Sequence, residues 1–172
     1  MFSLRPKKNE ARAALQPLYA NIVLIARAPH WYLAGAAPDT LDGRFDMVAA
    51  VMALVLMRLE QIGARGIGNA ALLTEIFIED MDAQLRQIGV GDLVVGNHIG
   101  RMVAALGGRL GAYRETLDDD AALREALVRN LYRGVAPAEP ALDHMIQELR
   151  ALAHALAAQD EAALLCGEIL AA

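Results

Sequence analysis

"AALLTEIFIEDMDAQLRQI", residues 70–88, is the stretch that decides the fold class. Seven apolar side chains recur in it at spacings of one, three and four residues, which is the period of a helix with one buried face. They are Leu72, Leu73, Ile76, Phe77, Met81, Leu85 and Ile88. Asn69 is placed to cap the start of this helix, and Gly89 is placed to end it. The stretch therefore predicts an amphipathic helix.

The segments on either side also read as helices. Residues 47–57, "MVAAVMALVLM", are apolar throughout, but this run is too short to cross a bilayer and indicates a buried core helix instead. That helix is expected over about 44–62, ending in the glycine-rich residues 63–68. Alternating strand patterns and fixed repeats are absent from the sequence. Further helices are expected over about 11–28, 93–117, 117–132, 140–158 and 160–170.

The fold expected from this pattern is all-α, a single compact domain of about six to seven helices over residues 11–172. Residues 1–10 are expected to form a flexible basic tail, because Arg5, Lys7 and Lys8 lie there among polar neighbours.

Charge and cysteine usage narrow the class of function. The chain has 16 Lys and Arg against 21 Asp and Glu, a net charge of -5, so specific nucleic-acid binding is not expected. Cys166 is the single cysteine, which excludes an internal disulfide and fits a reducing compartment. Its apolar helical neighbours predict a place in the core. A secretory signal is not expected, because the first apolar stretch follows Arg12 and is interrupted by Pro17. We expect a cytoplasmic protein, either free or in peripheral contact with the inner face of the cytoplasmic membrane.

The residues show no convincing catalytic, nucleotide or metal site. Gly91 and Gly96 have the spacing of a phosphate-binding loop, but Asn97 and His98 stand where that loop needs Lys and then Ser or Thr. The acidic residues of the 70–88 helix lack the Glu-x-x-His partner of carboxylate metal sites, and the four histidines are scattered. Asp82 is expected to pair with Arg86 one turn later. We therefore expect no enzyme activity, no metal and no cofactor.

Small residues recur along the helix expected after Gly91. Gly96, Gly100, Ala104 and Gly108 follow one another every four residues and form a stripe with almost no side chains. Such a stripe lets another helix approach closely. Either a helix of the same domain fills it, or a segment of a partner docks there.

Two stretches, residues 30–59 and 77–113, contain several short motifs in a fixed order. The motifs in the first stretch are Pro38-Asp39-Thr40 and Asp42-Gly43-Arg44-Phe45-Asp46. Those in the second are Asp80-Met81-Asp82, Leu85-Arg86 and Gly89-Val90-Gly91-Asp92. In this order and spacing they resemble the ubiquinol–cytochrome c chaperone family, the assembly factors of the cytochrome bc1 complex.

The resemblance implies an all-helical, non-enzymatic chaperone that binds a protein client, cytochrome b or another bc1 subunit. It also implies a small helper protein, and contact with the membrane or the ribosome. The family usually has a lysine after Gly96 and a basic pair before the following Met. Here Arg101 alone keeps a positive charge among those positions, so contact with ribosomal RNA or an anionic membrane should be weaker.

The residues that we expect on a partner-binding surface are Trp31, Tyr32, Asp42, Arg44, Asp46, Asp80, Asp82, Arg86, Asp92, Gly96, Gly100, Arg101 and Arg109. Asp92 is also expected to cap its helix. Several of these residues could instead form a buried network of Arg–carboxylate pairs that holds the two stretches together. An alternative function is a helical binding protein for haem, quinone or a lipid, with His30 or His98 as an axial ligand of a haem.

Overall fold

A computed structural model describes residues 4–169, and it describes the side chains of residues 8–91 and 94–169. Within residues 4–169 every regular element is a helix, as expected for an all-α chain. Six helices have eleven residues or more, and two are single turns of five residues. The helices are α1 (Leu4–Ala26), α2 (Pro29–Leu33), α3 (Leu41–Gln61), α4 (Ala64–Gln87), α5 (Asp92–Thr116), α6 (Asp120–Asn130), α7 (Glu139–Ala158) and α8 (Glu161–Leu165).

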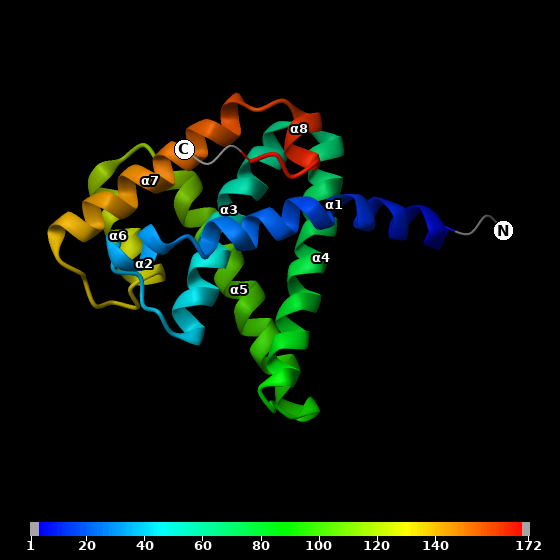
Figure 1. Cartoon of the computed structure of the whole chain (residues 1–172), viewed down its shortest axis with the longest axis horizontal. Helices are drawn as coiled ribbons and strands as arrows, with labels where there is room; N and C mark the ends of the chain where they lie inside the picture. The colour runs from blue at the N-terminus through cyan, green and yellow to red at the C-terminus, as the bar shows by residue number, and fades with distance from the viewer. Residues whose placement is uncertain (1–3, 170–172) are drawn as a thin grey trace.

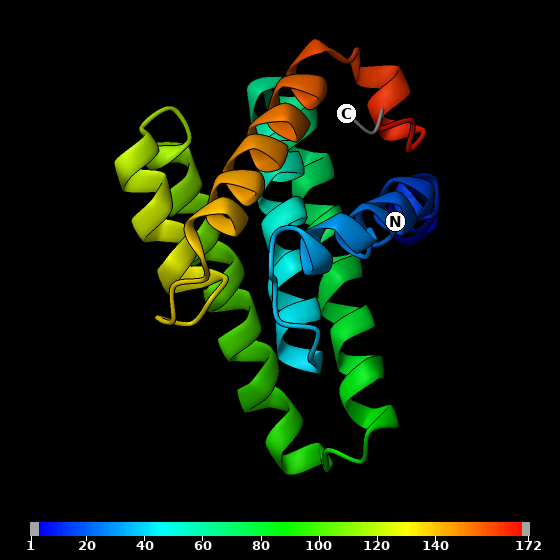
Figure 2. The same ribbon diagram turned by 60° about the vertical axis from the view of Figure 1, so that its left-hand side comes forward.

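Helix α3 lies at the centre of the domain and is buried along most of its length. It packs against α1, α4, α5 and α7 (Figures 1 and 2). The expected apolar core run lies in its middle, where Met47 through Leu56 are all buried. Thr40 starts the helix, because its side chain accepts a hydrogen bond of 3.0 Å from the backbone N–H of Gly43. The start of α3 thereby presents Asp42 and Asp46, one turn apart, on one face.

Helices α4 and α5 form a long antiparallel hairpin whose closed end projects beyond the other helices (Figure 2). Gly89 ends α4 as expected, with a left-handed φ of +86° that other residues rarely adopt. The next N–H, that of Val90, donates to the carbonyl of Leu85 at 3.0 Å and completes the helix cap. The paired glycines at 89 and 91 therefore form a turn.

Two expected helix starts are wrong. Helix α4 begins at Ala64, so Asn69 lies inside it and does not cap it. Only Ile62 and Gly63 separate α3 from α4, and the positive φ of Gly63, +95°, lets the chain turn there. Gly66 then permits a close approach, since a Cβ there would overlap the carbonyl group of Leu59. Helix α1 begins at Leu4, so the tail expected over residues 1–10 is helical from that residue on, and residues 1–3 lie outside the described part.

Two further expectations differ in detail. Gly91 occupies the N-cap position of α5 and Asp92 is its first residue, and the side chain of Asp92 lies outside the described residues. Cys166 is exposed, not in the core, because α8 ends at Leu165. Gly167 turns there with a φ of +81° and fits against the backbone of Pro17. Among the described residues, the helices are all too short or too polar to cross a membrane.

Candidate functional site

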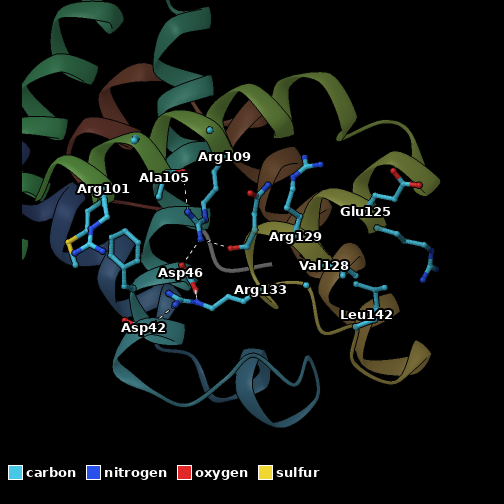
Figure 3. A pocket seen from close by; sticks show the side chains of 18 of the residues that line it. Asp42, Asp46, Arg101, Ala105, Arg109, Glu125, Val128, Arg129, Arg133 and Leu142 are labelled. Carbon is cyan, nitrogen blue, oxygen red and sulfur yellow. Dashed lines mark hydrogen bonds and ion pairs between the residues drawn. The ribbon is translucent and has the colours of Figure 1, made fainter. Parts of the chain in front are cut away.

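An open cleft of about 1260 Å³ lies between the start of α3, the middle of α5, α6 and the segment leading into α7 (Figure 3). We call it the α5 cleft. Its charged lining residues are Asp42, Asp46, Arg101, Arg109, Arg124, Glu125, Arg129, Arg133 and Glu139. Its apolar lining residues are Phe45, Met102, Ala104, Ala105, Val128, Ala136 and Leu142.

A network of charged groups forms the floor of the α5 cleft. Asp46 and Arg109 are an ion pair whose side chains are only 2% and 6% exposed. Arg133 donates to Asp46 at 2.8 Å and to Asp42 at 2.9 Å, and both bonds are drawn in Figure 3. Arg109 also donates to the backbone carbonyls of Ala105, at 3.1 Å, and of Asn130. The network thereby joins α3, α5 and the end of α6, which supports the buried-network alternative for Asp46 and Arg109.

Burial and charge act in opposite directions on Asp46. Burial raises the pKa of its carboxyl above the ordinary value, and the guanidinium groups of Arg133 and Arg109 partly offset that rise by favouring the charged form. Two buried nitrogen atoms beside the network, Nε of Arg109 and Nδ2 of Asn130, lack a hydrogen-bond partner among the described residues. A buried ion pair of this kind makes the cleft floor costly to disrupt.

Sequence reasoning missed Arg133. It has a left-handed φ of +54° and precedes Gly134, whose φ is +86°. For a residue other than glycine this conformation is strained, and here the bonds to Asp42 and Asp46 offset the strain. Asp46 lies 87 residues away in the chain, so no local spacing pairs it with Arg133. The one signal in the sequence was Gly134, which follows Arg133 at the start of a linker that contains prolines and so indicates a turn.

The remaining arginines of the α5 cleft differ in how they are neutralised. Arg124 forms ion pairs with Asp120, Glu139 and Asp143. Arg101 contacts only the ring of His98 on its own helix, at 3.0 Å. Neither Arg101 nor Arg129 forms an ion pair within the part of the chain whose side chains are described. Two guanidinium groups therefore line the cleft without a carboxylate.

The small-residue stripe of α5 is not filled by another helix of the domain. A Cβ added at Gly96, Gly100 or Gly108 would meet no atom within 4 Å, and Ala104 is exposed. Of the two alternatives for this stripe, filling by a helix of the same domain is therefore wrong. The reason is that α5 faces α3, α4 and α6 with its other sides. Ala104 and Gly108 line the α5 cleft, so the open stripe leads from the cleft toward the end of the hairpin.

Other expected surface residues have structural partners. The expectation that Trp31 lies on the surface is wrong, because its side chain is buried, with 2% of the residue exposed. Its indole nitrogen donates a hydrogen bond of 2.8 Å to the carbonyl of Ile25. Tyr32 donates to the carbonyl of Ala26. Asp80 accepts hydrogen bonds from Tyr19 and Gln84, which ties α4 to α1.

Three candidates, Arg44, Asp82 and Arg86, form exposed ion pairs instead. Arg44 pairs with Asp39 at 2.7 Å. Asp82 pairs with Arg86 at 2.8 Å, as expected from their spacing. Exposed pairs of this kind contribute little to stability.

The histidines considered as haem ligands have other contacts. Nδ1 of His30 lies 3.2 Å from Nε2 of His144, and His98 contacts Arg101. Burial lowers the pKa of His30 below 6.5, and His144 lowers it further, while Glu148 acts in the opposite direction. Among the described side chains, there is no group of three or more His, Cys, Asp and Glu that could hold a metal ion.

Comparisons with known proteins identify relatives for this fold. The family model described as ubiquinol-cytochrome C chaperone matches residues 34–171. Among solved structures, the chain is similar to the crystal structure of the Cbp3 homolog from Brucella abortus, with a TM-score of 0.81 and 28% identity. That match covers 98% of this chain and 94% of the other. A comparison with curated protein sequences gave no match.

Proposed function

This chain belongs to the ubiquinol-cytochrome c chaperone family, and we propose that it is a non-enzymatic assembly factor for the cytochrome bc1 complex. It binds newly made cytochrome b through helix–helix contacts before that client receives its haem and partner subunits. The binding takes place at the inner face of the cytoplasmic membrane, where the apolar helices of the client have not yet packed. The family match over residues 34–171 is the observation that carries this proposal.

The structure supports it with a surface suited to helix contacts. Gly96, Gly100, Ala104 and Gly108 leave the outer face of α5 almost bare, and no part of the described domain covers it. Helices approach one another most closely across small residues, which brings backbone and apolar side chains into contact. Glycine inside a helix costs about 1 kcal/mol relative to alanine. The exposed glycines therefore lower the stability of α5, and a need for close approach by a client helix would explain why they are there.

A capture experiment tests the proposal. The tagged full chain is used to isolate bound proteins from its own host in mild detergent, and cytochrome b is quantified by mass spectrometry. We expect the unaltered chain to enrich cytochrome b, and Gly100→Leu to reduce that enrichment at least about fivefold, because a leucine holds a client helix away.

Gly68→Leu is the matched control. Gly68 also lies on an exposed helix surface where an added Cβ meets nothing, but on α4. Its enrichment of cytochrome b should equal that of the unaltered chain. If cytochrome b is not enriched by the unaltered chain, the proposed client is wrong. If both leucine variants enrich it equally, the stripe is not the contact surface.

A further inference from the structure

We propose that the α5 cleft binds an acidic, partly apolar peptide segment of the client, whose carboxylates pair with Arg101 and Arg129. This inference rests on the proposed function and deepens it, because it assigns the chemistry of the client segment. The cleft is a site separate from the helix contacts along Gly96 and Gly100, because neither glycine lines it.

The distribution of charge carries the inference. Three of the five cleft arginines are neutralised, because Arg109 and Arg133 share Asp46 and Arg124 has three carboxylate partners. Arg101 and Arg129 have none among the described side chains. Both lie on the exposed walls of the cleft, one on α5 and one on α6. A guanidinium group in such a position favours a carboxylate, which it can bind through two parallel hydrogen bonds.

Figure 3 shows how these groups are arranged. Arg101, Arg109 and Arg129 follow one another along the cleft beneath α5. Glu125, a cleft carboxylate that forms no ion pair within the described side chains, lies beyond Arg129 on the side away from Arg101. The positive part of the cleft is therefore the stretch between Arg101 and Arg129.

Apolar side chains lie beside these charges. Met102, the neighbour of Arg101 in the chain, and Phe45 line the cleft. Val128 and Leu142 lie on the side away from Arg101 (Figure 3). A segment that fits here needs apolar residues next to its acidic ones. Burial of apolar surface would then supply binding free energy, and the carboxylates would fix position.

A polyanion fits this cleft poorly. Binding of a nucleic acid needs many Lys and Arg groups on consecutive phosphates, whereas the cleft has two unneutralised arginines. Glu125, which forms no ion pair within the described side chains, would repel the remaining phosphates. The whole chain also has a net charge of -5. A peptide with one or two acidic residues matches the charge that the cleft presents.

Peptide binding tests the inference. The probes are overlapping 15-residue peptides that cover the cytochrome b sequence of the same host, measured by fluorescence anisotropy against the full chain. We expect the peptides that bind to contain Asp or Glu beside apolar residues. Replacing those residues by Asn or Gln should weaken binding about tenfold, since each pair is a charge-assisted hydrogen bond.

The protein side of the test uses the double variant Arg101→Gln/Arg129→Gln. It should lose about tenfold on the acidic peptides and nothing on their amide counterparts. The matched control, Arg65→Gln/Arg114→Gln, removes two exposed arginines outside the cleft and should bind like the unaltered chain. Circular dichroism confirms that each variant is folded.

Several results would overturn the inference: no peptide binds, amide peptides bind as tightly as acidic ones, or the cleft variant binds as tightly as its control. The capture experiment separates this failure from a failure of the proposed function. If the cleft variant still enriches cytochrome b fully, the cleft assignment is wrong and the assembly role stands. If the unaltered chain enriches no cytochrome b, the assembly role itself fails.

Discussion

Replacing Asp46 by alanine should destabilise the domain by about 3–5 kcal/mol, because it leaves the guanidinium group of Arg109 buried without its counter-charge. Arg109 is only 5% exposed, and its other bonds are to two backbone carbonyls, which carry no net charge. The loss is a large part of the roughly 5–15 kcal/mol that stabilises a typical domain. Urea unfolding followed by circular dichroism measures it directly.

Asp42→Ala is the matched control for this change. Asp42 pairs with the same Arg133 as Asp46 does, but its side chain is 69% exposed. Pairs of this kind contribute at most about 1 kcal/mol, so the control should unfold close to the unaltered chain. The double variant Asp46→Leu/Arg109→Met should recover most of the loss, since it removes both buried charges. A loss below about 1 kcal/mol for Asp46→Ala, or no recovery in the double variant, would refute the argument.

Two further predictions concern packing and pH. Gly66→Ala should lower the free energy of unfolding by about 2 kcal/mol or more, because the added Cβ would overlap the backbone of Leu59. Gly68→Ala, where the added Cβ lies in open space, should raise the free energy of unfolding by about 0.5–1 kcal/mol. Equal urea midpoints for the two variants would contradict this prediction. His30 lies beside His144, and its pKa in the folded chain is below 6.5. As the pH falls through about 6.5, His30 therefore becomes protonated in the unfolded chain but stays neutral in the folded chain. Stability should therefore fall from about pH 7.5 toward the folded pKa of His30, and His30→Asn should reduce the fall measured by thermal unfolding, while the exposed control His154→Asn should not.

The helical period and the turn residues account for what could be predicted of the fold. The apolar positions from Leu73 to Leu85 and the turn at Gly89 are local patterns, and the structure confirms both. The start of α4 could not be predicted, because Gly63 and Gly66 look alike in sequence. Only the tertiary contact with Leu59 shows that the second is a packing glycine inside the helix.

The candidate site was predicted less completely, for a physical reason. The residues expected on a partner-binding surface included Asp42, Asp46 and Arg109, and the structure joins all three through one network. Arg133 completes that network from a segment that reads as a linker, and its pairing depends on how α6 ends. Trp31 was misplaced on the surface because an aromatic residue in a loop-rich stretch carries no signal of burial, whereas α2 turns it into the core.

The most direct test of the assembly role is the amount of assembled bc1 complex in a host strain that lacks this chain. The difference spectrum of its b-type haems and the abundance of cytochrome b in membranes measure that amount. We predict that both fall when the chain is absent and recover when the unaltered chain is restored, but not when Gly100→Leu is restored. Normal levels of haem and cytochrome b in the strain without the chain would contradict the account.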